Sequence, residues 1–381
     1  MKIILDITNK VIILLFFLIV ALHISIIVLK KIQKENLYYI SLNDFQKKSY
    51  SHLEKNEIND LLKSIWYRNW EYSPIVGFIE GSLESQFVNV NSFGVRSNNQ
   101  KHVTYNDLDN SIWFFGGSAT FGYGVEDIYT IPSRFEKISN EKVINFGTGF
   151  YYSFQENHLL KKMLETHKPN YVIFLDGINE RCKIVQYQNE MRQLFKKSQN
   201  IYNWELQTMF EPFLFYANKI LSKRNQRIQK SSWGQQLEDC KKNGKTIPLS
   251  TVVDRNLLER KRICEFNNIK CYTFLQPFPR IQVPHKDEIR LPINASDSMK
   301  KLYGILKPIF KKNDGITLEN LPFDFNQHYY VDSAHYNRKA TKIIANSIFA
   351  FPTERYLNIV KRGYKNCDLD KSYLINALKG S

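Results

Sequence analysis

The chain has 381 residues, 43% of them hydrophobic, which is enough for one large domain or two small ones with a sizeable core. A formal net charge of +16 suits an anionic partner such as an acidic glycan or an anionic lipid, but no standard nucleic-acid-binding motif occurs, and we expect no nucleic-acid partner. The five cysteines are too few and too scattered for a disulfide framework or a zinc site, although one pair is compatible with an oxidising compartment.

An uncharged apolar segment near the amino terminus predicts a membrane anchor. Residues 11–29 contain no Asp, Glu, Lys or Arg and are long enough to cross the hydrocarbon core of a bilayer. Lys30 and Lys31 follow where a signal peptide would carry small residues for cleavage, so we expect residues 1–31 to remain as a single membrane span. Lysines flank the segment on both sides, so the positive-inside rule gives no clear orientation and only slightly favours a cytoplasmic C-terminal part.

The next part of the chain has the composition of a connector followed by short strands. Residues 32–70 are polar and mixed in charge, and we interpret them as a connector next to the membrane. Between residues 72 and 96 the pattern alternates around glycines, as it does in short strands or hairpins.

From residue 111 onward, short apolar runs alternate with segments of helical periodicity. This order predicts an α/β domain over residues 71–352, with a parallel sheet covered by helices on both faces. The predicted strands are 111–115, 143–146, 171–175 and 271–275, and the predicted helices are 127–139, 153–167, one from about 179, 253–267, 296–311 and 335–350.

Two regions do not follow this alternation. Residues 183–250 are rich in Gln, Lys and aromatic residues, and they form an insertion for which a helical cap and a solvated loop are both compatible interpretations. Residues 353–381 form a basic C-terminal tail without a recognisable motif.

A candidate nucleophile follows the first predicted strand of the domain. The apolar run ends at Gly116 and Gly117, and Ser118 comes next, which places its hydroxyl at the carboxyl end of a strand, where open parallel sheets bind ligands. The glycine-rich turn matches neither the phosphate-binding loop, nor the dinucleotide-binding fingerprint, nor the Gly-x-Ser-x-Gly elbow. The motif alone therefore does not assign a role to Ser118.

A base and its orienting group occur together near the C-terminus. A serine nucleophile needs a base, and the base needs a group that holds its tautomer. Asp332 and His335 lie three residues apart at the start of the predicted helix 335–350, so the carboxylate and the imidazole can face one point. The alternative is that Asp332 is a helix N-cap and His335 an unrelated surface histidine.

Two further strand ends offer hydrogen-bond donors for an oxyanion. A glycine turn, Asn145–Phe150, follows the second strand, and Asn179 follows the third. Each is compatible with an ordinary turn, because Gly and Asn are turn residues. Three consecutive strands thus end in Ser, Gly and Asn, and all of them can meet Asp332 and His335 at one crevice.

In this set of blocks, the chain resembles the SGNH or GDSL hydrolases over residues 72–350. Asn91–Arg96 also looks like the segment that leads into the domain in membrane-anchored bacterial members. Gly117 and Glu180 each stand at a position where the family usually has Asp. The resembling blocks are Gly116–Ala119, Asn145–Gly149, Gly177–Glu180 and Asp332-x-x-His335.

The resemblance implies a three-layer αβα sandwich and an ester hydrolase or acyltransferase. Ser118 would be the nucleophile, His335 the base and Asp332 the group that orients it. The oxyanion donors would be the backbone N–H of Ser118, that of Gly149 or Phe150, and the side chain of Asn179. No metal or cofactor is implied.

The resulting prediction is a membrane-anchored serine esterase that cleaves O-acyl groups, with cell-envelope glycans as the substrate suggested by anchored relatives. The same analogy places the domain outside the cytoplasm. An O-acyltransferase with the same triad and a non-catalytic glycan-binding relative are the alternatives. The sequence does not define the acyl group or the oligomeric state.

Overall fold

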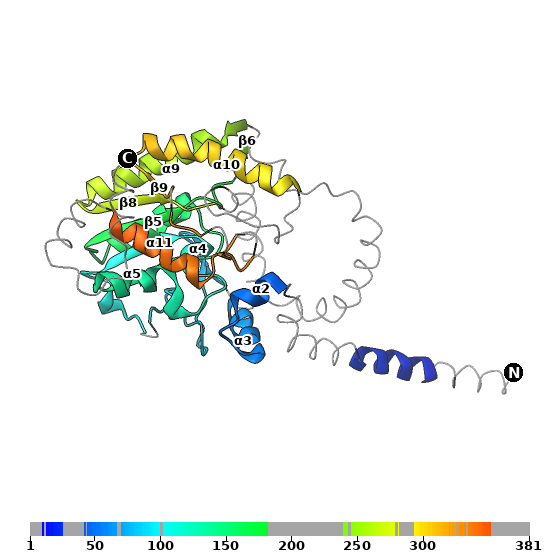
Figure 1. The fold of residues 1–381 in the computed structure, drawn as a ribbon. Coiled ribbons are helices and arrows are strands. Elements are labelled where there is room, and N and C mark those ends of the chain that lie inside the picture. Colours follow the sequence, from blue (N-terminus) through cyan, green and yellow to red (C-terminus); the bar gives the residue numbers. More distant parts are fainter. Residues whose placement is uncertain are drawn as a thin grey trace.

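A five-stranded parallel sheet lies at the centre of the computed structural model of the chain (Figure 1). The strand order is β4-β3-β5-β8-β9, and each neighbouring pair is parallel. Strands β3, β4 and β5 are almost fully buried between helices on both faces, which explains why they are nearly continuous apolar runs in the sequence. Their bounds are β3 (Ile112–Gly116), β4 (Val143–Asn145), β5 (Tyr171–Asp176), β8 (Lys270–Leu275) and β9 (Ile316–Thr317).

Helices cover the two faces of this sheet, so the expected α/β fold with a parallel sheet is confirmed. Ile112 and Phe114 point to the face covered by α5 and α11, whereas Trp113 and Phe115 point to the face covered by α6 and α9, as the alternation of side chains along a strand requires. The helices are α5 (Ile131–Ser139), α6 (Ser153–Leu164), α9 (Leu249–Phe266), α10 (Ile293–Lys312), which packs along α9, β8 and β9, and α11 (Arg338–Ala350).

The structure describes most of the α/β domain and part of the amino-terminal region. Its described residues are 10, 13–25, 42, 44–66, 70–99, 102–181, 239–242, 245–278, 281, 293–319, 321–324, 327–332 and 334–351. The C-terminal tail and residues 183–238 of the insertion lie outside them.

The segment expected to be a connector is folded against the domain. It forms α2 (Asp44–Ser49) and α3 (Lys55–Trp66), and a hairpin of β1 (Trp70–Ser73) and β2 (Gly77–Glu80) follows. The apolar face of α3, which includes Leu61 and Ile65, packs on Phe121, Tyr123 and Val331. Phe121 ends the short helix α4 (Ser118–Phe121) that follows β3, and Tyr123 and Val331 lie in the loops after α4 and before α11, so α3 contacts the same end of the sheet as Ser118.

Residues 13–25 form a helix whose large apolar side chains are 37–63% exposed. Among the residues that the structure describes, no helix is both long enough and apolar enough to cross a membrane. The other residues of the predicted span, 11–12 and 26–29, are outside the described part. In the insertion, the described end is an antiparallel hairpin of β6 (Asp239–Lys242) and β7 (Lys245–Pro248), so this part of it is not helical.

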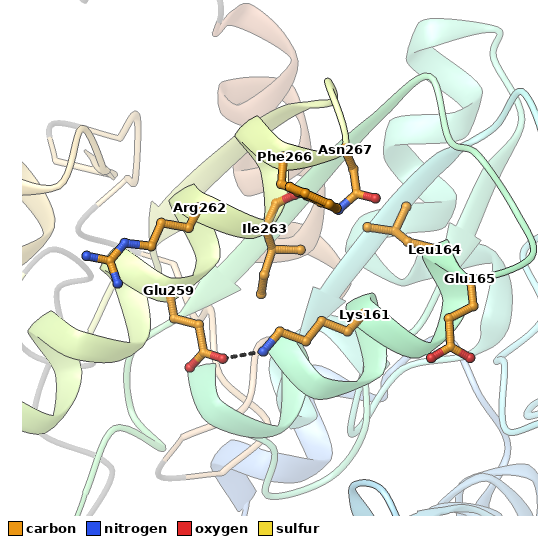
Figure 2. Close-up of a pocket in the computed structure, with 8 residues that line it drawn as sticks. All are labelled: Lys161, Leu164, Glu165, Glu259, Arg262, Ile263, Phe266 and Asn267. Atoms are coloured by element: carbon orange, nitrogen blue, oxygen red, sulfur yellow. Dashed lines mark hydrogen bonds and ion pairs between the residues drawn. The ribbon is translucent and has the colours of Figure 1, made fainter.

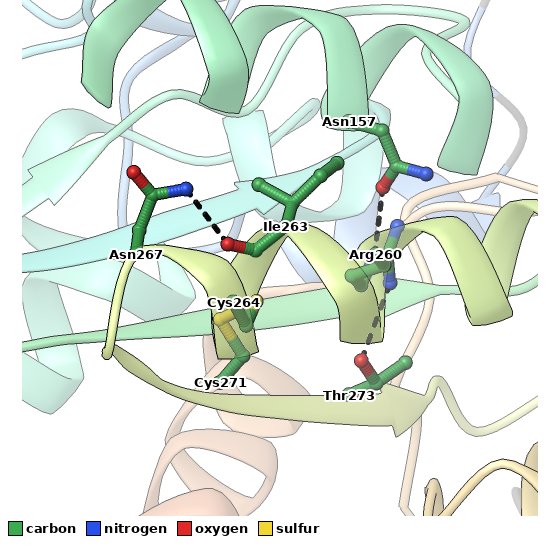
Figure 3. The surroundings of a disulfide bond; sticks show 7 residues. All are labelled: Asn157, Arg260, Ile263, Cys264, Asn267, Cys271 and Thr273. Carbon is green, nitrogen blue, oxygen red and sulfur yellow. Dashed lines mark hydrogen bonds between the residues drawn. A yellow bond between two sulfur atoms is a disulfide. The ribbon is translucent and has the colours of Figure 1, made fainter. Parts of the chain in front are cut away.

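A disulfide connects helix α9 to the sheet. A disulfide joins Cys264, near the end of α9, to Cys271 in β8, across the turn between the helix and the strand (Figure 3). Arg260 lies one turn before Cys264 on α9, and its side chain donates to Oδ1 of Asn157 in α6. The pairing, which the sequence left open, thus fixes α9 to the strand that it covers.

Candidate active site

Ser118 is the first residue of α4 (Ser118–Phe121), directly after β3 and its glycine turn. Gly117 allows the Asn179 side chain to approach closely, because a Cβ at position 117 would lie 2.3 Å from Nδ2 of Asn179. The chain turns again at Gly122, which ends α4 with a left-handed φ of 93°. Two tight turns on either side of a short helix therefore present Ser118 at the carboxyl edge of the sheet.

His335 and Asp332 complete a hydrogen-bonded chain with Ser118. His335 Nε2 lies 2.8 Å from Ser118 Oγ, and His335 Nδ1 lies 2.7 Å from Asp332 Oδ2. The other carboxylate oxygen of Asp332 accepts from the backbone N–H groups of Ala334 and His335, both at 2.8 Å. This arrangement has the connectivity of a Ser-His-Asp triad.

The electrostatics of Asp332 suit an orienting anion. Burial alone raises the pKa of this carboxyl, but the charge and hydrogen bond of His335, together with the two backbone N–H groups, outweigh burial and lower the pKa overall. Asp332 is therefore ionised at neutral pH and can stabilise a protonated His335.

The predicted start of the last helix is wrong by three residues. Helix α11 begins at Arg338, and its N-cap is Asn337, whose side chain accepts from the N–H groups of Lys339 and Ala340. Asp332 and His335 instead lie in the loop before the helix, where Asp332 closes a turn on its own backbone. The two side chains meet because of this turn and not because of helical spacing.

Aromatic side chains flank His335 on the side of α3. The Tyr123 ring lies 4.9 Å from the imidazole, and the Trp66 ring lies 6.3 Å from it at 75°. Trp66 is 48% exposed, so one of its faces is accessible beside the triad. The sequence placed Trp66 in the connector, and only the packing of α3 brings it to the site.

The expected oxyanion donors are not equivalent in the structure. Asn179 packs against Gly117 and donates one amide N–H to the carbonyl of Tyr151 at 2.9 Å. The Gly149 N–H donates to Oε1 of Glu80 at 2.7 Å, so it is already used in this structure. Phe150 has a left-handed φ of 65°, which is uncommon for a bulky residue and is easily adopted by glycine.

One residue that sequence reasoning missed is Arg96, at the end of the block Asn91–Arg96. It is fully buried, pairs with Asp127 at 2.8 Å, and donates to the carbonyls of Phe121, Gly122 and Val125 at 2.7–2.8 Å. These carbonyls belong to the end of α4 and the loop after it, so Arg96 fixes the short helix that carries Ser118. The motif itself was visible in the sequence, but the role needs the fold.

A buried charged cluster lies behind Asn179. Arg260 donates to Asp176 at the end of β5 and to Glu156 and Asn157 in α6. Burial, and then the charge of Asp176, raise the pKa of Glu180 to about 7, although Glu180 accepts from Ser153 N at 2.7 Å and Oγ at 3.0 Å. The same two causes raise the pKa of Glu156 well above its usual range. One cation thus faces three carboxyl groups.

A pocket that is separate from Ser118, His335 and Asp332 lies between α6 and α9 (Figure 2). Lys161 and Glu259 form an ion pair across it, and Phe266, at its edge, is 90% exposed. None of the triad or oxyanion residues lines it. Within the described ranges, no group of three or more His, Cys, Asp or Glu residues could hold a metal ion.

No family model and no curated protein matches the chain. Similar solved structures include a member of the lipolytic protein G-D-S-L family from Veillonella parvula, with 12% identity, 64% of this chain and 98% of that chain covered, and a TM-score of 0.36. They also include a psychrotrophic esterase from Pseudoalteromonas (12% identity, 66% and 100% covered, TM-score 0.34) and a lipase/acylhydrolase from Enterococcus faecalis (14%, 63% and 93%, 0.35).

Proposed function

We propose that the chain is a serine ester hydrolase of the SGNH type. The hydrogen-bonded chain from Asp332 through His335 to Ser118 carries this proposal, because it holds a nucleophile, a base and an orienting carboxylate in one line at the edge of the sheet. The side chain of His335 can accept the proton of Ser118 as its oxygen attacks the acyl carbonyl, and Asp332 stabilises the imidazolium that forms.

The negative charge that develops on the carbonyl oxygen needs donors on the side opposite His335. The second amide N–H of Asn179 and the backbone N–H of Ser118 are the first two in this proposal. We assign the third to Phe150 and not to Gly149, because the Gly149 N–H donates to Glu80. His335 then protonates the departing alcohol, and a water molecule activated by His335 releases the acyl group from Ser118.

We propose further that the substrate is an O-acyl group on a cell-envelope glycan and that residues 1–31 anchor the enzyme in a membrane, with the domain outside the cytoplasm. The exposed apolar helix at 13–25 supports an anchor, because an all-round apolar helix is stable in lipid or in a protein core. The Cys264–Cys271 disulfide supports an oxidising compartment. The charge of +16 suits an acidic polymer.

A fluorophosphonate probe and an ester screen test the catalytic proposal. The full-length chain in detergent should be labelled at Ser118 and should release the acyl group from simple esters, and Ser118→Ala should do neither. A wild-type protein that is neither labelled nor active would point to a non-catalytic glycan-binding protein. Labelling with acyl transfer to a sugar hydroxyl, and without hydrolysis, would identify an O-acyltransferase.

The compartment is tested separately with a reporter fused after Ser381. Alkaline phosphatase, which needs an oxidising compartment, should be active in this fusion, and a cytoplasmic reporter at the same position should not. The opposite result would place the domain in the cytoplasm and contradict the glycan substrate.

A further inference from the structure

A buried carboxylate outside the catalytic motifs contacts the loop that supplies the proposed oxyanion donor. Glu80, the last residue of β2, is 1% exposed. Its Oε1 accepts from the Gly149 N–H at 2.7 Å, and its Oε2 accepts from the indole N–H of Trp70 at 3.0 Å. A carboxylate can satisfy both donors at once, since each of its oxygens is an acceptor.

The same hairpin supports the neighbouring residues of the loop. The Trp70 ring packs edge-on against the Phe150 ring, with centroids 5.5 Å apart at 81°. The Tyr151 hydroxyl donates to the carbonyl of Phe78 in β2. The β1–β2 hairpin therefore holds three consecutive residues, 149, 150 and 151, from one side.

This support matters because the loop is strained at Phe150. A left-handed φ at a residue with a bulky side chain is unfavourable, and it persists only where the surroundings enforce it. The Gly149 N–H bond fixes the peptide just before this residue. Without it, the loop can relax, and the direction of the Phe150 N–H changes with it.

We propose that Glu80 is a positioning residue of the oxyanion hole. It binds the Gly149 N–H and so aims the next N–H, that of Phe150, at the acyl carbonyl on Ser118, while Trp70 orients the carboxylate. This inference rests on the proposed hydrolase function. Glu80 does not contact the reacting atoms; it acts through the loop.

The Glu80→Gln variant tests this proposal, and a second substitution, Trp70→Phe, should restore part of the lost activity. In Glu80→Gln, an NH₂ group replaces one carboxylate oxygen. This NH₂ group must face either the Gly149 N–H or the Trp70 N–H. In either case, the NH₂ group and that N–H are two hydrogen-bond donors that point at each other. In the double variant with Trp70→Phe, the indole donor is gone, so the amide oxygen can return to Gly149. The double variant should therefore be more active than Glu80→Gln alone.

We expect Glu80→Gln to weaken the binding of the transition state more than the binding of the substrate. Glu80→Gln should lower kcat by roughly tenfold or more with KM little changed, since complete loss of an oxyanion donor lowers kcat by about 10²–10³. Affinity for a trifluoromethyl ketone, whose oxyanion occupies the hole, should fall in parallel. Labelling of Ser118 by the fluorophosphonate should become slower but still occur.

Glu136 provides the matched control. It also joins a backbone N–H, that of Val143, to a side-chain amide, that of Asn99, but it does so at the opposite end of β4. Glu136→Gln should leave kcat and the ketone affinity at the wild-type level even if the melting temperature falls.

Three outcomes would overturn the proposal. They are an unchanged kcat and ketone affinity in Glu80→Gln, a loss that matches that of Glu136→Gln, or a double variant no better than the single one. If Glu80→Gln does not fold, Trp70→Phe alone should still lower kcat more than KM, and an unchanged kcat there overturns the proposal. A wild-type enzyme without labelling or ester turnover overturns the proposed function and this inference together, whereas an active wild type with an active Glu80→Gln overturns this inference alone.

Discussion

At the scale of single residues, the triad makes the strongest prediction. Ser118→Ala and His335→Ala should each lower kcat for an ester by roughly 10⁴–10⁶-fold, and the double variant should be little worse, because the two groups act as one unit. Asp332→Asn should be less severe. Steady-state kinetics with a chromogenic ester measures this. Near wild-type turnover in His335→Ala would show that the base lies elsewhere.

Asn179 makes a separate prediction, because its amide has one N–H on the Tyr151 carbonyl and a second one free to meet substrate in the proposal. Asn179→Ala should lower kcat by roughly 10²–10³ while the fold, judged by circular dichroism, stays intact. If turnover is unchanged, Asn179 only supports the turn.

Glu180 predicts a pH dependence of stability. Burial and Asp176 raise its pKa to about 7 in the folded protein, above its value in the unfolded chain. The folded state therefore binds more protons between about pH 4.5 and 7, so this group lowers the free energy of unfolding as pH rises through that window, and its full penalty is present above it. A pKa of about 7 in place of the usual 4.5 corresponds to a full penalty of roughly 3–4 kcal/mol.

The measurement compares urea unfolding of the wild type and Glu180→Gln at pH 5, 6, 7 and 8. The stability of the wild type should fall more with pH than that of the variant. Only this slope is informative, because the amide also weakens the bonds to Ser153. Identical slopes would mean that Glu180 does not titrate in this range.

At the scale of elements, the long periodic segments were predictable and the short ones were not. The strands at 112–116 and 171–176 and the helices α6 and α9 were found, because burial on two faces or on one stripe leaves a clear pattern. The strand β9, with two residues, has no room for a period. The start of α11 was misplaced, because Asp332 has the chemistry of a cap but bonds within its own turn.

The residues of the candidate site also divide into those that the sequence predicts and those that it does not. Ser118, His335, Asp332 and Asn179 follow recognisable patterns, and the structure brings all four together. Trp66 and Glu80 were missed, since nothing in a sequence tells which distant helix or hairpin will pack on a loop.

The turn between β3 and α4 predicts that a side chain at position 117 would move Asn179. Gly117→Ala should displace Asn179, which lies 2.3 Å from the added Cβ, and should lower kcat nearly as much as Asn179→Ala does. Gly304→Ala, in α10 with nothing within 4 Å, is the control and should raise stability by up to about 1 kcal/mol. Full activity in Gly117→Ala would show that Asn179 is not needed where it lies.

At the scale of the whole molecule, the helices after the apolar segment belong to the folded unit. Deletion of residues 1–40 should leave turnover and melting temperature unchanged. Deletion of residues 1–66 removes α3 and uncovers Phe121, Tyr123 and Val331, and each such side chain contributes about 2 kcal/mol when buried. That sum is comparable with the stability of a typical domain, so the shorter protein should unfold at much lower temperature and lose turnover.

Differential scanning fluorimetry and ester kinetics on the two truncated proteins measure this difference. A stable and active protein that begins at residue 67 would show that α3 is dispensable.

The position of α3 beside His335 also sets how far the enzyme can work from its anchor. Eighteen residues, 26–43, lie between Ser25 and α2, and a segment of that length spans at most about 60–65 Å when fully extended. If the apolar helix lies in a membrane, as proposed, the active site can reach only the layer within a few nanometres of the membrane surface. A polymer held in that layer would meet the same enzyme repeatedly at a raised effective concentration, whereas free chains would meet it rarely.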